Sequence, residues 1–208
     1  MAPRVLISTF GFDETKVLRA LRWLPYDSLV LLAGGKSLRG PGLRRLRAAE
    51  RAGGGTVEIV AVDPFDFPSC FRGTLDAIER HRRAGAEVRV NVSGGTKVLA
   101  DAALLASFQA GVEAWHCEDR PLRLPVLRGV TLTDDLTPVR KAVLAAVGRP
   151  LPATKVADRV RLAGFSEAAV QAAINWLRLR EFVTVEVRGG VAIVSRNPRT
   201  AWFVRSLL

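Results

Sequence analysis

The run of residues 87–97, E-V-R-V-N-V-S-G-G-T-K, constrains the fold most strongly, because a strand pattern stops at two glycines where a helix pattern begins. Valines alternate with polar residues over 88–92, as in a buried strand. The glycine pair at 94–95 allows a tight turn, and Thr96 is a typical N-cap for a helix over 97–110. The run therefore predicts a strand, a close turn and a helix in direct succession.

A junction of this kind is a candidate anion site. The first amides of the helix have no intrahelical acceptor and lie at the positive end of its macrodipole, and Lys97 adds a cation beside them. The alternative interpretation is a tight connection without a ligand, since S-G-G-T-K is not a complete nucleotide-binding fingerprint.

Strand and helix patterns alternate from the N-terminus to about residue 134. Helices between short apolar strands predict a parallel sheet covered on both faces, which is a Rossmann-like α/β domain over 1–134. The expected strands are 4–9, 28–33, 57–62, 88–92, 111–117 and 124–132, and the expected helices are 13–23, 43–52, 69–84 and 97–110.

The remaining residues, 135–208, follow a different pattern. Three helices are expected, and a hairpin with Gly189 and Gly190 at its tip follows them, which is the order of a winged helix-turn-helix domain. From Leu136 onward, 12 Lys and Arg stand against 4 Asp and Glu, a net charge of +8. This excess favours double-stranded DNA as the partner over protein docking, the other common use of the fold. The expected DNA-binding residues are Lys155, Ser166, Gln171, Asn175, Arg178 and Arg188.

Ligands of open α/β sheets bind beyond the carboxyl ends of the strands. The first strand ends in S-T-F-G-F-D and the fourth in S-G-G-T-K, so these loops would face each other if the two strands are neighbours. Hydroxyls, a lysine and two helix N-termini fit a phosphodiester with a base. The expected ligand-binding residues are Ser8, Thr9, Phe10, Gly11, Phe12, Ser93, Gly94, Gly95, Thr96 and Lys97.

Other motifs do not support a site. The run 34–37 ends like a Walker A loop, but Leu31 stands where that loop needs glycine, so Lys36 is the natural control position for Lys97. Cys70 and Cys117 are expected to be idle thiols, and no metal ligand, cofactor or catalytic residue is assigned. With no apolar run of about 20 residues and no secretory signal, the chain is expected to be cytoplasmic.

These motifs together resemble those of the CARF proteins, the CRISPR-associated Rossmann-fold regulators, and in particular the archaeal regulators that add a winged helix. The resemblance rests on V-L-I-S-T-F-G-F-D-E near the start, on N-V-S-G-G-T-K-V-L-A-D-A-A, and on the tail. It implies a homodimer that binds a cyclic oligoadenylate, usually cyclic tetra-adenylate, across its two-fold seam. The ligand motifs of the family fall on residues 8–13 and 93–97.

Three functions follow from this sequence. The first is a ligand-responsive transcription regulator of CRISPR-associated genes. The second is a ring nuclease that cleaves the ligand in the same crevice, although no clear general base is present. The third is a DNA-bound assembly protein without an active ligand response.

Overall fold

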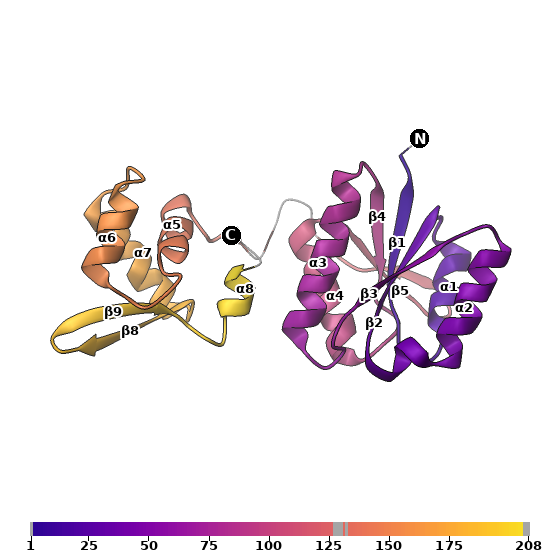
Figure 1. Ribbon diagram of the computed structural model, residues 1–208. Helices are drawn as coiled ribbons and strands as arrows, with labels where there is room; N and C mark the ends of the chain where they lie inside the picture. The colour runs from indigo at the N-terminus through magenta and orange to yellow at the C-terminus, as the bar shows by residue number, and fades with distance from the viewer. Residues whose placement is uncertain (1, 127–130, 132, 206–208) are drawn as a thin grey trace. The chain divides into compact units, whose positions relative to one another are not determined.

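The computed structural model describes residues 2–126, 131 and 133–205, and the chain divides into two compact units. We call Met1–Leu132 unit 1 and Thr133–Leu208 unit 2 (Figure 1). In the ranges that the structure describes, no helix is both long and apolar enough to cross a membrane.

Unit 1 is built on one six-stranded sheet in the order β3-β2-β1-β4-β5-β6. The first five strands are parallel, and β6 pairs antiparallel with β5. Most of their apolar residues are buried because helices cover both faces of the sheet. The strands are β1 (Arg4–Thr9), β2 (Ser28–Ala33), β3 (Val57–Ala61), β4 (Glu87–Asn91), β5 (Glu113–Cys117) and β6 (Pro121–Arg123).

Two pairs of helices enclose this sheet. Figure 1 shows α1 (Thr15–Trp23) and α2 (Pro41–Ala52) on one face, and α3 (Phe67–Arg83) and α4 (Lys97–Ala110) on the other. A short 3-10 helix, η1 (Gly35–Arg39), precedes α2. The predicted α/β fold with a mostly parallel sheet is therefore confirmed.

The end of unit 1 departs from the prediction. A strand was expected over 124–132, but among the described residues of this unit the last strand is β6, and residues 124–126 belong to no strand. The amide of Leu124 still donates to the carbonyl of Ala114 in β5, and the amide of Val126 donates to the carbonyl of Leu124 at 2.8 Å, so the chain turns at Pro125. Residues 127–130 and 132 lie outside the described residues.

Unit 2 combines helices with a small antiparallel sheet. The helices α5 (Pro138–Ala146), α6 (Ala153–Arg161) and α7 (Glu167–Leu179) pack around buried aliphatic side chains. The sheet has the order β7-β9-β8, with β7 (Leu151–Pro152), β8 (Val183–Arg188) and β9 (Val191–Arg196). Neither β7 nor the final helix α8 (Ala201–Arg205) was expected.

The hairpin of unit 2 depends on its two glycines. Gly189 and Gly190 connect β8 to β9 with φ angles of 57° and 78°, in the left-handed region that favours glycine. Upstream, the Ser166 hydroxyl caps α7 by accepting from the amide of Ala169 at 3.3 Å.

Candidate functional site

The topology of unit 1 brings the two expected loops together. β1 lies between β2 and β4, and Ser8 is in register with Asn91. Because the strand order reverses at β1, the carboxyl ends of β1 and β4 form the switch point of the sheet, where α/β proteins bind ligands.

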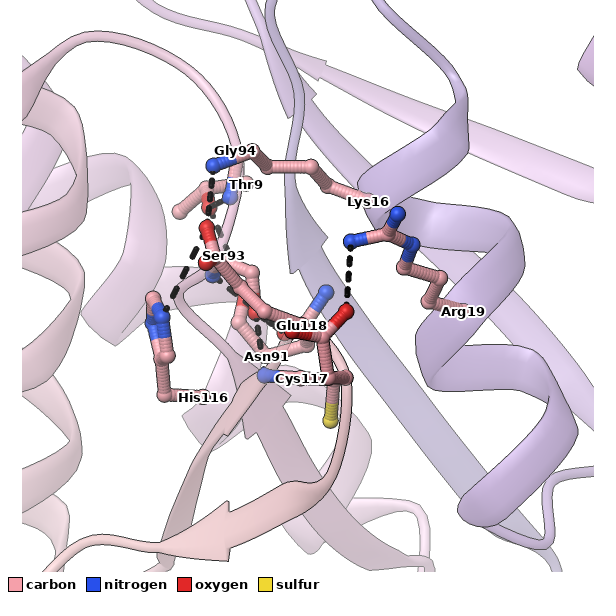
Figure 2. Close-up of polar contacts among 10 residues, drawn as sticks. Thr9, Lys16, Arg19, Asn91, Ser93, Gly94, His116, Cys117 and Glu118 are labelled. Carbon is pink, nitrogen blue, oxygen red and sulfur yellow. Dashed lines mark hydrogen bonds and ion pairs between the residues drawn. The ribbon is translucent and has the colours of Figure 1, made fainter.

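Contact between these loops is direct. The amide of Gly94 donates to Oγ1 of Thr9 at 3.2 Å, and that hydroxyl donates to the carbonyl of Asn91 at 3.3 Å (Figure 2). A Cβ atom at Gly94 would lie 2.5 Å from the carbonyl oxygen of Thr9, and one at Gly11 would lie 3.1 Å from Cα of Gly95. Gly94 is thus required by the close approach of two backbones, apart from any ligand, whereas a side chain at Gly11 would need the backbone of Gly95 to shift by a few tenths of an ångström.

A buried side-chain network supports the turn from below. Asn91 donates from Nδ2 to the Ser8 hydroxyl at 2.8 Å, and Ser93 donates from Oγ to Oδ1 of Asn91 at 2.5 Å. The amide of Cys117 in turn donates to Oγ of Ser93 at 2.5 Å, which ties β5 to β4 (Figure 2). Both ends of the Asn91 amide are therefore used inside the protein.

A cleft of about 620 Å³ opens above this network. It includes most of the expected ligand residues, whereas Ser8 and Thr9 are fully buried and take no part in its lining. The lining residues are Phe10, Gly11, Phe12, Asp13, Lys16, Gly34, Gly35, Lys36, Ser37, Pro64, Phe65, Ser93, Gly94, Gly95 and Thr96.

The two lysines chosen for contrast lie in unexpected places. Lys97 is not part of the lining; its Nζ lies 2.6 Å from Oδ1 of Asp101, and its side chain is 86% exposed. Lys36 does line the cleft, so it is not suited to be the neutral control for Lys97. Although Lys36 lies in the 3-10 helix η1, where a P-loop would have an α-helix, the segment after β2 still reaches the same edge of the sheet as the ends of β1 and β4.

The loops after β2 and β3 also line the cleft, which was not predicted from the sequence. Gly34 packs so closely on the strand end of β3 that a Cβ atom there would overlap the carbonyl of Val62. Thr96 donates from Oγ1 to the carbonyl of Pro64 and accepts at the same oxygen from the amide of Leu99 at 3.1 Å. The shared carboxyl edge of parallel strands was the signal that could have identified these loops.

Charge in the cleft is partly neutralised. Nζ of Lys16 lies 2.5 Å from Oε1 of Glu118, and this pairing lowers the pKa of the glutamate (Figure 2). Nε2 of His116 lies 3.8 Å from the same oxygen. The other lysine of the lining, Lys36, has no ion-pair partner among the residues that the structure describes.

Metal ligands do not cluster in the parts of the chain that the structure describes: no group of three His, Cys, Asp or Glu could hold an ion there. Cys70 and Cys117 are both buried, and burial raises the pKa of each thiol to about 11. Both thiols are therefore protonated near neutral pH.

The expected DNA-binding residues of unit 2 lie on separate elements. Gln171, Asn175 and Arg178 are exposed at i, i+4 and i+7 on α7 and line a shallow groove with Val185 of β8. Arg178 also donates to Oδ1 of Asn175 at 3.1 Å.

The other three positions differ in their surroundings. Lys155 is exposed on α6, and Arg188 at the end of β8 lies 2.7 Å from the carboxylate of Glu186. Ser166 is the N-cap of α7, so its hydroxyl already has a structural use.

Three solved structures share the fold at low sequence identity. A type III CRISPR defence DNA nuclease activated by cyclic oligoadenylate is 19% identical, with a TM-score of 0.52, over 86% of this chain and 30% of that one. Can2 from Sulfobacillus thermosulfidooxidans, in complex with cyclic tetra-adenylate, is 16% identical, with a TM-score of 0.51, over 96% and 61%. Protein VC1899 from Vibrio cholerae is 12% identical, with a TM-score of 0.50, over 97% and 64%. The chain spans less than two thirds of the length of each.

No curated protein matches the chain significantly. A protein-family model does: the one described as "HFX_2341_N:-like, N-terminal" matches residues 4–119, which is more than half of the chain and includes both loops of the switch point. The chain therefore belongs to the HFX_2341_N:-like, N-terminal family.

Proposed function

We propose that this protein is a transcription regulator of CRISPR-associated genes that binds cyclic oligoadenylate in unit 1 and double-stranded DNA through unit 2. The observation that carries the ligand half is the turn at Gly94–Thr96, which lines the cleft at the switch point. Among the described residues, no acceptor takes the amide hydrogens of Gly95 and Thr96. Free amides at the head of α4 are the donors that a phosphate requires.

The proposed ligand is cyclic tetra-adenylate, bound by a homodimer. A ring of four identical nucleotides has near two-fold symmetry, so two copies of one cleft would meet it in the same way. Lys36 and the free amides would face its phosphates. The fold shared with Can2, which was solved with this ring, supports the assignment.

The DNA half of the proposal treats residues 135–208 as a winged helix-turn-helix domain, following the ligand domain 1–134. In it, α6 and α7 form the helix-turn-helix and the β8–β9 hairpin is the wing. Gln171 and Asn175 would then reach base edges, and Lys155, Arg178 and Arg188 would contact phosphates.

The test is to titrate the purified protein with cyclic oligoadenylates of several ring sizes while following both binding and product formation. We expect binding without turnover and a change in operator affinity of about 1–3 kcal/mol. Turnover of the ring would favour the ring-nuclease alternative. An absence of binding at any ring size would reject the ligand half.

Coupling between the halves has its own test. A flexible Gly/Ser insertion between Asp135 and Leu136 should leave both binding activities intact and remove their dependence on each other. The same insertion between Gly53 and Gly54, in an exposed turn of unit 1, is the matched control and should preserve coupling. DNA titrations of the unmodified protein that superimpose with and without saturating ligand would exclude a switch.

A further inference from the structure

Two large apolar side chains at the cleft are exposed to solvent. Phe12, between β1 and α1, is 68% exposed, and Phe65, between β3 and α3, is 78% exposed. Both line the cleft that contains Lys36 and the free amides of Gly95 and Thr96. In the part of the chain that the structure describes, neither ring contacts another aromatic ring. Exposed aromatic rings at the edge of a cleft are a feature of binding surfaces.

The backbone that carries Phe65 is held in place although its ring is free. Its amide donates to Oδ1 of Asp63 at 3.0 Å, and the carbonyl of the preceding Pro64 accepts from the Thr96 hydroxyl. This loop is thus tied to the N-cap of α4, so Phe65 and the anion-binding turn keep a fixed spacing.

Phe12 is held in a similar way. A Cβ atom at Gly42 would collide with its carbonyl oxygen, so the backbone at Phe12 lies directly against the start of α2. The ion pair between Glu14 and Arg45 fastens the start of α1 to the same helix. Both rings therefore project from fixed loops, which lowers the entropy lost when a ligand binds.

We infer that Phe12 and Phe65 are base-stacking residues, and that the cleft selects purine nucleotides by stacking. The inference rests on the proposed function and assigns the base-binding part of that site. An inorganic anion would bind to the amides and Lys36 without contacting the two exposed rings. A nucleotide would use the amides and Lys36 for its phosphate and the rings for its base. Stacking on aromatic rings is available to every base and is stronger for larger ring systems, so purines gain more than pyrimidines.

The experiment compares the full chain with the Phe12→Leu and Phe65→Leu variants, which keep apolar bulk and lose the aromatic face. Trp23→Leu is the matched control, because Trp23 is a 55% exposed aromatic residue at the far end of α1, outside the cleft lining. The probes are cyclic tetra-adenylate, its cyclic uridylate counterpart, and cyclic tetra-adenylate with one adenine replaced by fluorescent 2-aminopurine. Each Phe→Leu change should weaken adenylate binding about 5- to 150-fold, and Trp23→Leu should not.

The fluorescent probe separates stacking from a general loss of structure. Its emission should be quenched on binding to the unmodified protein and should recover at saturation in the Leu variants, while Phe65→Trp should restore affinity. If both Leu variants bind the adenylate ring and quench the probe as the unmodified protein does, the inference is overturned and the proposed function stays in place. Equal affinity for adenylate and uridylate rings would also overturn it. If the unmodified protein binds none of the three rings, the proposed function and the inference both fail.

Discussion

Units 1 and 2 build their candidate surfaces from different parts of the chain. In unit 1 the cleft is lined largely by loop residues at one edge of a sheet, and the hydroxyls of Thr9 and Ser93 are engaged within the protein. In unit 2 the candidate surface consists of exposed side chains on α7 and the hairpin. Substitutions at the close-packed glycines of unit 1 should therefore act through shape, whereas substitutions of exposed side chains in either unit should remove one contact at a time.

The largest effect is expected from Gly94→Ala, which tests the shape of the cleft. The new Cβ would lie 2.5 Å from the Thr9 carbonyl, so one of the two backbones must shift. We expect ring binding to be lost and the free energy of unfolding to fall by about 1–3 kcal/mol, the cost of overpacking. Calorimetric titration and urea denaturation measure the two effects. Gly53→Ala is the control, because its nearest neighbour would lie at 3.5 Å, and wild-type binding by Gly94→Ala would contradict the assignment.

Lys36→Ala should weaken cyclic oligoadenylate binding by about 1.5–3 kcal/mol, since a charge-assisted hydrogen bond to phosphate is lost. Lys97→Ala should have a smaller effect, because its ammonium is paired with Asp101 outside the cleft lining. Affinities of both variants, measured at one salt concentration, decide between them. A larger loss of affinity in Lys97→Ala than in Lys36→Ala would indicate that Lys97, at the start of α4, contacts the phosphate.

In unit 2, single contacts should give graded effects of two kinds. Asn175→Ala should cost about 1–3 kcal/mol on a preferred DNA site and nothing on random DNA. Arg188→Ala should weaken binding to all sequences and reduce the salt slope by about one unit. Salt-dependent binding curves on both DNAs distinguish these patterns. Identical behaviour of the two variants would mean that α7 does not read bases.

Near neutral pH the smallest effect is expected from the two buried cysteines, because their contribution to stability changes only at alkaline pH, and both lie in unit 1. Burial raises the pKa of the Cys70 and Cys117 thiols to about 11, so the folded state retains protons that the unfolded chain releases above about pH 8.5. The stabilisation is complete below that pH and is lost as the pH rises toward 11. The melting temperatures of the unmodified chain and of a Cys70→Ala, Cys117→Ala double variant, measured by calorimetry, should converge as the pH rises over this range. Parallel curves would contradict the prediction.

How far the sequence predicts these features depends on how local they are. The strand, turn and helix of 87–110 follow from neighbouring residues, and the structure reproduces them within one residue. The α/β pattern predicted that the loops after β1 and β4 meet only if these two strands are adjacent. The observed strand order places them side by side.

What the sequence did not reveal is non-local. Gly34 and Lys36 looked like a failed phosphate loop because they were judged by their neighbours in sequence, whereas the parallel sheet places them beside Pro64 and Gly94. Within the described residues, the strand expected over 124–132 is absent at 124–126 because of the turn at Pro125, which apolar alternation does not indicate. The exposure of Phe12 and Phe65 required the structure, since aromatic residues beside strands are usually buried.

The pairing of β1 with β4 also sets when the cleft can form during synthesis. β1 emerges from the ribosome first, but the turn that completes the cleft follows β4, more than 80 residues later in the chain. Contacts so distant in sequence form slowly, because the intervening loop must close before they contribute. In a nascent chain that ends before Gly94 the cleft is incomplete, so the proposed ligand could bind only after the turn at Gly94–Thr96 has left the ribosome.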